Sequence, residues 1–249
     1  MNHGVANIKS IALKYSLAGQ GFEYKVDGDD IVLTKYTGSA SDFIVPSLIT
    51  KIGAYAFYNC RNIESVRIPD NITSIENSTF EDCINLREII LPDNITSIGN
   101  EAFNNCVNLQ SIVFPSSLVS IGSGAFENCR SLTSIIIPNG VLIIGDATFE
   151  NCVNLVSVSI PDSLTNIGLG IFDTCVSLQE IILPNSLTTI EDYTFSACSN
   201  LVRVVIPDSI VSIGIQVFSG CSKLKELEIP ATCEYKYNSF PEHTKIVRR

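Results

Sequence analysis

The sequence predicts an α/β repeat protein, folded as a right-handed solenoid with a parallel β-sheet on its concave side. Three observations predict it: proline, phenylalanine and cysteine each recur every 23 residues without an insertion. Phenylalanine, for example, occupies positions 57, 80, 103, 126, 149, 172, 195 and 218. A unit of this length cannot bury its apolar face alone, so neighbouring units must stack into one continuous core.

One strand is expected in each unit, just before the proline. Within residues 111–115, Ile112 and Phe114 alternate with Ser111 and Val113, which is the period-two pattern of a strand. β-Branched residues crowd the same segment in every unit. The proline ends the strand because it has no N–H group to give to the ladder. The Asp, Asn or Ser residues that follow it favour a turn.

The second half of each unit has a different spacing. Ala102, Phe103, Cys106 and Leu109 lie at offsets of 0, 1, 4 and 7, on one face of a helical turn or two. The sequence therefore predicts short helical segments on the convex side of the solenoid. A glycine ahead of them, such as Gly99, is expected to let the chain turn a corner.

Both ends of the solenoid need caps, because an end unit would otherwise expose core and strand edges. The Asp27-Gly28 pair, with alternating apolar residues on both sides, predicts a hairpin at the front. After Pro230 the 23-residue pattern stops, and a short strand near the end closes the array. The predicted parts are an N-terminal segment, weakly helical or without order (1–19), the cap hairpin with the first strand (20–45), eight repeats (46–230) and a C-terminal cap (231–249).

Charge and hydropathy exclude two classes of partner. The net charge is −10, and the stretch from Glu88 to Val202 holds eleven acidic residues and one basic residue, Arg130. Such a surface repels a nucleic-acid backbone, so no nucleic acid is expected to bind. The longest apolar runs are far shorter than the roughly 20 residues that span a bilayer, so no membrane insertion is expected. The first residues do not form a visible signal peptide.

No chemistry-bearing motif stands out, and neither an enzyme nor a cofactor is expected. The nine cysteines lack the close spacing of metal sites, and the eight periodic ones are expected to pack in the core. Cys233 lies outside the series and is the one candidate for a reactive thiol. His3 and His243 lie in the terminal segments, without a triad around them. Glu180 and Glu226 are expected to be solvated rather than paired in a pocket.

Three sequons for N-glycosylation occur within the repeats. We attribute them to the asparagine-rich repeat rather than to glycosylation. They begin at Asn71, Asn77 and Asn94.

Outward strand positions are the best candidates for a binding surface. If the buried strand residues point inward, their neighbours form two rows on the concave sheet. The first row is Ser65, Glu88, Ser111, Ser134, Ser157, Glu180, Arg203 and Glu226, and the second is Arg67, Ile90, Val113, Ile136, Ser159, Ile182, Val205 and Glu228. An apolar stripe with charges at its ends is typical of protein-binding surfaces. The competing explanation is that β-branched residues simply suit strands.

The repeat also resembles a known family. The pattern LxxIxIPxxVxxIGxxAFxxC is met almost letter for letter by LTSIIIPNGVLIIGDATFENC at residues 132–152. It is similar to the BspA-like, Treponema-type leucine-rich repeats, and the YTG at 36–38 resembles the usual N-terminal cap of that family. The resemblance covers roughly residues 20–249. It implies a curved leucine-rich-repeat solenoid that acts in adhesion or host interaction, at the cell surface or after secretion.

The sequence therefore predicts a non-enzymatic module that binds a protein or peptide ligand across the concave sheet. The apolar residues would supply contact area and the charged ones would orient the ligand. The expected contacts are Arg67, Ile90, Val113, Ile136, Ser159, Ile182, Val205, Glu228, Arg203 and Glu226. The alternative is a structural protein that forms a homo-oligomer through the same apolar row.

Overall fold

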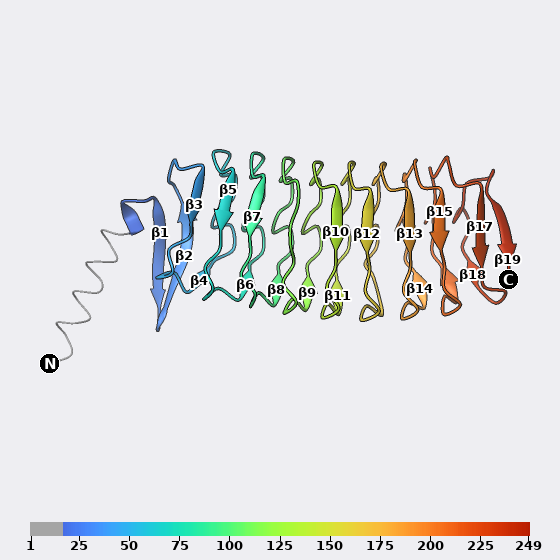
Figure 1. Cartoon of the computed structure of the whole chain (residues 1–249), viewed down its shortest axis with the longest axis horizontal. Coiled ribbons are helices and arrows are strands. Elements are labelled where there is room, and N and C mark those ends of the chain that lie inside the picture. The colour runs from blue at the N-terminus through green and yellow to red at the C-terminus, as the bar shows by residue number, and fades with distance from the viewer. Residues whose placement is uncertain (1–16) are drawn as a thin grey trace.

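A computed structural model describes residues 17–249 of the chain. The repeats are stacked side by side along one long axis, in the order of the sequence (Figure 1). Most coils contribute a longer strand, a corner at the proline, a shorter strand and a side made only of turns. Most of the predicted N-terminal segment 1–19 lies outside the described residues, and of its last three residues Leu17 is buried in the core.

The longer strands form the side that the sequence predicts as the concave sheet, which we call the long-strand face. Neighbouring strands are parallel and in register, so that Ile135 lies beside Val158 and Ile181 beside Val204. These strands are β3 (Asp42–Ile44), β5 (Ser65–Arg67), β7 (Glu88–Ile90), β10 (Ser134–Ile136), β12 (Ser157–Ser159), β13 (Glu180–Ile182), β15 (Arg203–Val205), β17 (Glu226–Ile229) and β19 (Lys245–Arg248).

The regular repeat predicts a continuous sheet, but the sheet in the structure is interrupted. Its strands pair in four groups, β3-β5-β7, β10-β12, β13-β15 and β17-β19. Residues 111–113, which should supply the strand between β7 and β10, form none. Figure 1 shows wider spaces after β12 and after β15 than within the pairs.

A second row of parallel strands, each only two residues long in the repeats, was not predicted. It forms the short-strand face, and the isoleucine of each Ser-Ile pair points into the core, as Ile98 and Ile121 do. These strands are β4 (Lys51–Ile52), β6 (Ser74–Ile75), β8 (Ser97–Ile98), β9 (Ser120–Ile121), β11 (Ile143–Ile144), β14 (Thr189–Ile190), β16 (Ser212–Ile213) and β18 (Glu234–Tyr235).

Caps are present at both ends of the described chain. At the front, β1 (Phe22–Asp27) and β2 (Asp30–Tyr36) form an antiparallel hairpin, in which Gly28 adopts a φ of 62°. The loop thus uses the freedom of glycine in the left-handed region. At the back, β19 pairs in parallel with β17. The Arg248 guanidinium donates hydrogen bonds to the carbonyl oxygens of Ala231 at 2.7 Å and Cys233 at 2.9 Å.

The prediction of helices on the convex side is wrong. That side consists of successive turns, and among residues 20–249 there is no helix. Alternate backbone N–H groups bond to the next coil: Phe80 N donates to Ala102 O at 2.8 Å, and Phe126 N to Thr148 O at 2.9 Å. Helical N–H groups donate to the residue four positions back. Because these donors already serve the neighbouring coil, a helix cannot form.

Two positions in each coil turn the chain by adopting a positive φ, between 53° and 75°. One precedes the phenylalanine by two residues, as Tyr55 does, and the other precedes the cysteine by one, as Asn59 does. Asparagine, aspartate and glycine tolerate this left-handed region best. One of these three types precedes the cysteine in six of eight coils, at Asn59, Asp82, Asn105, Asn128, Asn151 and Gly220.

The core is a column of phenylalanine rings. All eight periodic phenylalanines are fully buried, and consecutive rings lie 4.8–5.8 Å apart between centroids, with interplanar angles of 3–13°. Phe240 of the C-terminal cap extends the column beyond Phe218 at 5.7 Å. The ladder of rings therefore requires the same 23-residue register in every coil.

We expect that Phe126→Ala will lower the free energy of unfolding by about 3–5 kcal/mol, because it leaves a cavity between two stacked rings. Val113→Ala is the matched control, since 82% of Val113 is exposed, and should change that free energy by less than about 0.5 kcal/mol. Urea denaturation followed by circular dichroism measures both. Equal effects of the two substitutions would contradict the stacked column.

Candidate binding surface

The long-strand face presents the residues that the sequence predicts as ligand contacts. In β10, Ile135 is buried, whereas Ile136 on the outer side is 74% exposed. Val113 is 82% exposed and Ile182 is 58% exposed. The predicted contacts that are exposed are Arg67, Val113, Ile136, Ser159, Ile182, Arg203, Glu226 and Glu228, and those that are half-buried are Ile90 and Val205.

The charged contacts predicted at the C-terminal end of this face are engaged within the chain. Arg203 pairs with Glu180, and Lys245 with Glu226 at 2.8 Å. Glu228 lies 3.8 Å from Arg249. Exposed pairs of this kind contribute little to stability. Among the described residues, Arg67 is the predicted contact at the front end that forms no ion pair.

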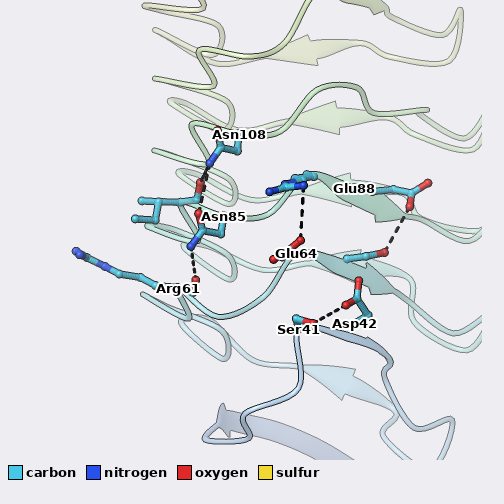
Figure 2. A network of polar contacts seen from close by, with 10 residues as sticks. Ser41, Asp42, Arg61, Glu64, Asn85, Glu88 and Asn108 are labelled. Atoms are coloured by element: carbon cyan, nitrogen blue, oxygen red, sulfur yellow. Dashed lines mark hydrogen bonds and ion pairs between the residues drawn. The ribbon is translucent and has the colours of Figure 1, made fainter.

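In the N-terminal coils, polar side chains just before the long strands bridge successive coils. Figure 2 shows Asn85 and Asn108 stacked one above the other, and the Asn85 side chain donates to the carbonyl of Arg61 at 2.7 Å. The Glu64 carboxylate lies 3.8 Å from Arg87 of the next coil. These bonds hold successive coils together and do not involve the aliphatic side chains of the second outward row.

A groove opens where the long-strand ladder is broken between β12 and β13. Its volume is about 950 Å³, and its lining includes Ile136, Val156, Ser157, Ser159, Ile182 and Val202. Sequence reasoning missed Val156 and Val202, which are 46% and 52% exposed. They occupy the position just before the first outward row, which is polar in the other repeats, for example Gln110. Valine in place of a polar residue at that position could have identified these two lining residues from the sequence.

Most acidic side chains of the middle coils lie away from this face, on the turn side. Burial, and then the neighbouring Glu101 carboxylate, raise the pKa of Glu127. Burial also raises the pKa of Glu150, and the carboxylates of Glu127 and Asp173 on either side add to the effect. No group of three or more metal-ligating side chains occurs within residues 17–249.

The periodic cysteines serve the coil-to-coil architecture. Each thiol from Cys83 to Cys221 is buried and donates to the carbonyl oxygen of a phenylalanine in the preceding coil, as Cys106 does to Phe80 at 3.2 Å. The expectation that Cys233 is reactive is not supported, because Cys233 is buried and burial raises its pKa. Among the described thiols, Cys60 is the only one that is partly exposed.

The sequon asparagines also bond from coil to coil. The Asn71 side chain donates to the carbonyl oxygen of Ile49 at 2.6 Å, and that of Asn94 to Asp70 at 2.6 Å. Asn77 Oδ1 accepts a hydrogen bond from the backbone of Asn100 at 2.8 Å. Each asparagine therefore has a structural use, which supports its assignment to the repeat.

Comparisons with known proteins agree with this geometry. A family model described as a BspA type leucine rich repeat region matches residues 34–155 and 119–247. A leucine-rich repeat protein from Bacteroides ovatus is 31% identical with a TM-score of 0.79, and the match covers 86% of this chain and 59% of that protein. The chain thus spans about three-fifths of the length of that relative.

Two further solved structures share the fold. The T. pallidum leucine rich repeat protein is 31% identical over 82% of this chain and 88% of its own, with a TM-score of 0.62. The pneumococcal vaccine antigen PcpA is 17% identical over 88% of this chain and 77% of its own, with a TM-score of 0.53, which shows the fold alone. A search of curated proteins gave no match. Within residues 17–249, no helix is long and apolar enough to cross a bilayer.

Cys60 should be the first of the described thiols to react with iodoacetamide in the native protein. Burial raises its pKa to about 11, so its alkylation rate should keep rising about tenfold per pH unit between pH 8 and pH 10. An unperturbed thiol, with a pKa of about 8.5, would level off above pH 9. Peptide mass spectrometry follows each site. Alkylation of Cys106 or Cys152 as fast as that of Cys60 would contradict the packed core.

Proposed function

Because the chain belongs to the BspA-type leucine-rich repeat family, we propose that it is a non-enzymatic module that binds a protein or peptide through its long-strand face. One observation carries the proposal: Val113, Ile136 and Ile182 are 82%, 74% and 58% exposed on strands or strand-like segments of one face. Exposed aliphatic stripes of this kind mark interaction sites in soluble proteins.

The shape of this face favours a macromolecular ligand. The described chain has no long loop that could roof the long-strand face, so a small molecule would stay largely in solvent. A protein or peptide, in contrast, can lie along several coils at once. Because the coils are locked together by backbone bonds, such a ligand would meet a preorganised surface, which reduces the entropy lost on binding.

The magnitudes indicate how many contacts a ligand needs. Burial of three aliphatic side chains contributes roughly 5–9 kcal/mol. Association itself costs an estimated 4–15 kcal/mol in lost translational and rotational freedom. The row alone therefore supports weak binding, and a specific ligand must also contact flanking groups such as Val156, Val202 or Arg67.

Adhesion or host interaction, at a cell surface or after secretion, is the setting that we propose for this binding. It is supported by the resemblance to the family, and fold by itself does not fix function. Self-association is the second candidate, because the same exposed row could cover a second copy of the chain. The two differ in the mass of the protein in solution.

The test uses a displayed library of random peptides, selected on the wild-type protein. The double variant Val113→Asp/Ile136→Asp should lose most of the selected peptides, because it places two charges in the apolar row. The matched control is Leu142→Asp/Ile143→Asp, which makes the same change in charge on the short-strand face, where these residues are 55% and 62% exposed. The control should retain the peptides.

Circular dichroism must first show that both variants are folded. Retention of every selected peptide by the Val113→Asp/Ile136→Asp variant would overturn the long-strand face as the binding surface. Light scattering on the wild-type protein separates the two candidates. Self-association would be favoured if the mass of the wild-type protein rises with concentration while the Val113→Asp/Ile136→Asp variant keeps the mass of a monomer.

A further inference from the structure

We propose that the groove between β12 and β13 receives one large aliphatic side chain of a peptide segment that carries lysine or arginine on either side of it. This inference rests on the proposed function and specifies the ligand. It depends on three features of the groove: a notch in the apolar row, a break in the strand ladder, and a lining that has acidic but no basic groups.

The notch is made by Ser159. In the outward row it stands between Ile136 and Ile182, its equivalents in the preceding and following coils. Ile136 and Ser159 are direct neighbours in the β10–β12 register. The strand is therefore in register, and the small serine side chain leaves a gap where the neighbouring coils have isoleucine. The walls of the notch are the two isoleucines, 74% and 58% exposed, and its floor is a hydroxymethyl group.

The break in the ladder enlarges the notch into a groove. β12 and β13 belong to different hydrogen-bonded groups, and the groove of about 950 Å³ extends over both strands. Val156 and Val202 lie on its other side, with Gln179 of the intervening coil between them, and the remaining repeats carry polar residues at this position. Four exposed aliphatic side chains thus surround a small polar floor. This arrangement fits an aliphatic side chain better than a sugar, because no aromatic ring lines the groove.

Charge determines what should flank that side chain. The lining contains Asp162 and Glu180 and no basic residue. Arg203 lies outside the lining and pairs with Glu180, which offsets the charge of both, so Asp162 is the lining carboxylate without an ion pair among the described residues. Arg130, the only basic residue of the middle coils, does not line the groove. An anionic segment would therefore meet like charge, whereas lysine or arginine beside the aliphatic side chain would be attracted.

The test measures binding of short synthetic peptides to the full chain by NMR titration. The first probe has one central leucine between alternating lysines and serines, the second has glutamate in place of lysine, and the third has serine in place of leucine. The lysine–leucine probe should bind at least about tenfold more tightly than either of the others, because only it supplies both the buried side chain and the complementary charge.

Two variants with the same chemical change locate the site. Ser159→Ile fills the notch with the residue type that both neighbouring coils already carry there, and should weaken the lysine–leucine probe about tenfold or more. Ser97→Ile is the control on the short-strand face, where Ile143 shows that a coil accepts isoleucine. It should leave the affinity unchanged. Asp162→Asn should weaken the lysine–leucine probe about two- to threefold and leave a leucine probe without charges unaffected.

An unchanged affinity in Ser159→Ile, or equal binding of the lysine and glutamate probes, would overturn this inference. Its failure is distinguishable from failure of the proposed function. Peptides from the displayed library that are lost in Val113→Asp/Ile136→Asp but keep their affinity for Ser159→Ile would uphold binding at the long-strand face and exclude the groove as the specific pocket.

Discussion

The structure depends on backbone hydrogen bonds that run between coils on the turn side. Three N–H groups in most coils donate to carbonyl oxygens of the next one, as Phe103 N does to Ala125 O at 2.8 Å. Unpaired backbone groups are costly when buried, so this pattern fixes the spacing of the coils and permits no insertion. The cysteine thiols add bonds to a different set of carbonyls, those of the phenylalanines in the preceding coil, and the same spacing stacks the phenylalanine rings. Register, core and cysteine ladder are therefore consequences of one bonding pattern.

The strands, the buried ladders and the outward rows could be predicted from the sequence, because the same residue pattern occurs in eight repeats. The strand alternation placed Val113, Ile136 and Ile182 outward, and the structure exposes all three. The helices were predicted wrongly because offsets of 0, 1, 4 and 7 suit both a helix and a series of turns that returns to one face. The residue before each cysteine distinguishes the two, since an asparagine there, as at Asn105, suits a left-handed turn.

The outward rows of the candidate site could be predicted from the sequence, but the groove between β12 and β13 could not. Ser159 is visible in the sequence as the small residue between two isoleucines, yet its meaning depends on the break between β12 and β13. That break is a matter of which strands pair, and the 23-residue pattern is the same on both sides of it. Asn71 and Asn94 show the reverse case, because residues that resembled modification sites are used by the architecture. The outward positions that the ladders do not use are therefore the candidates for the proposed binding.

Amide hydrogen exchange read residue by residue tests this account most directly. If the turn side is bonded from coil to coil, the amides of Phe103, Phe126 and Phe149 should exchange as slowly as the most protected strand amides, since they open only when coils separate. Exchange of these three amides at the rate of exposed turns, while the strand amides stay protected, would contradict the bonding pattern from which the rest of the structure follows.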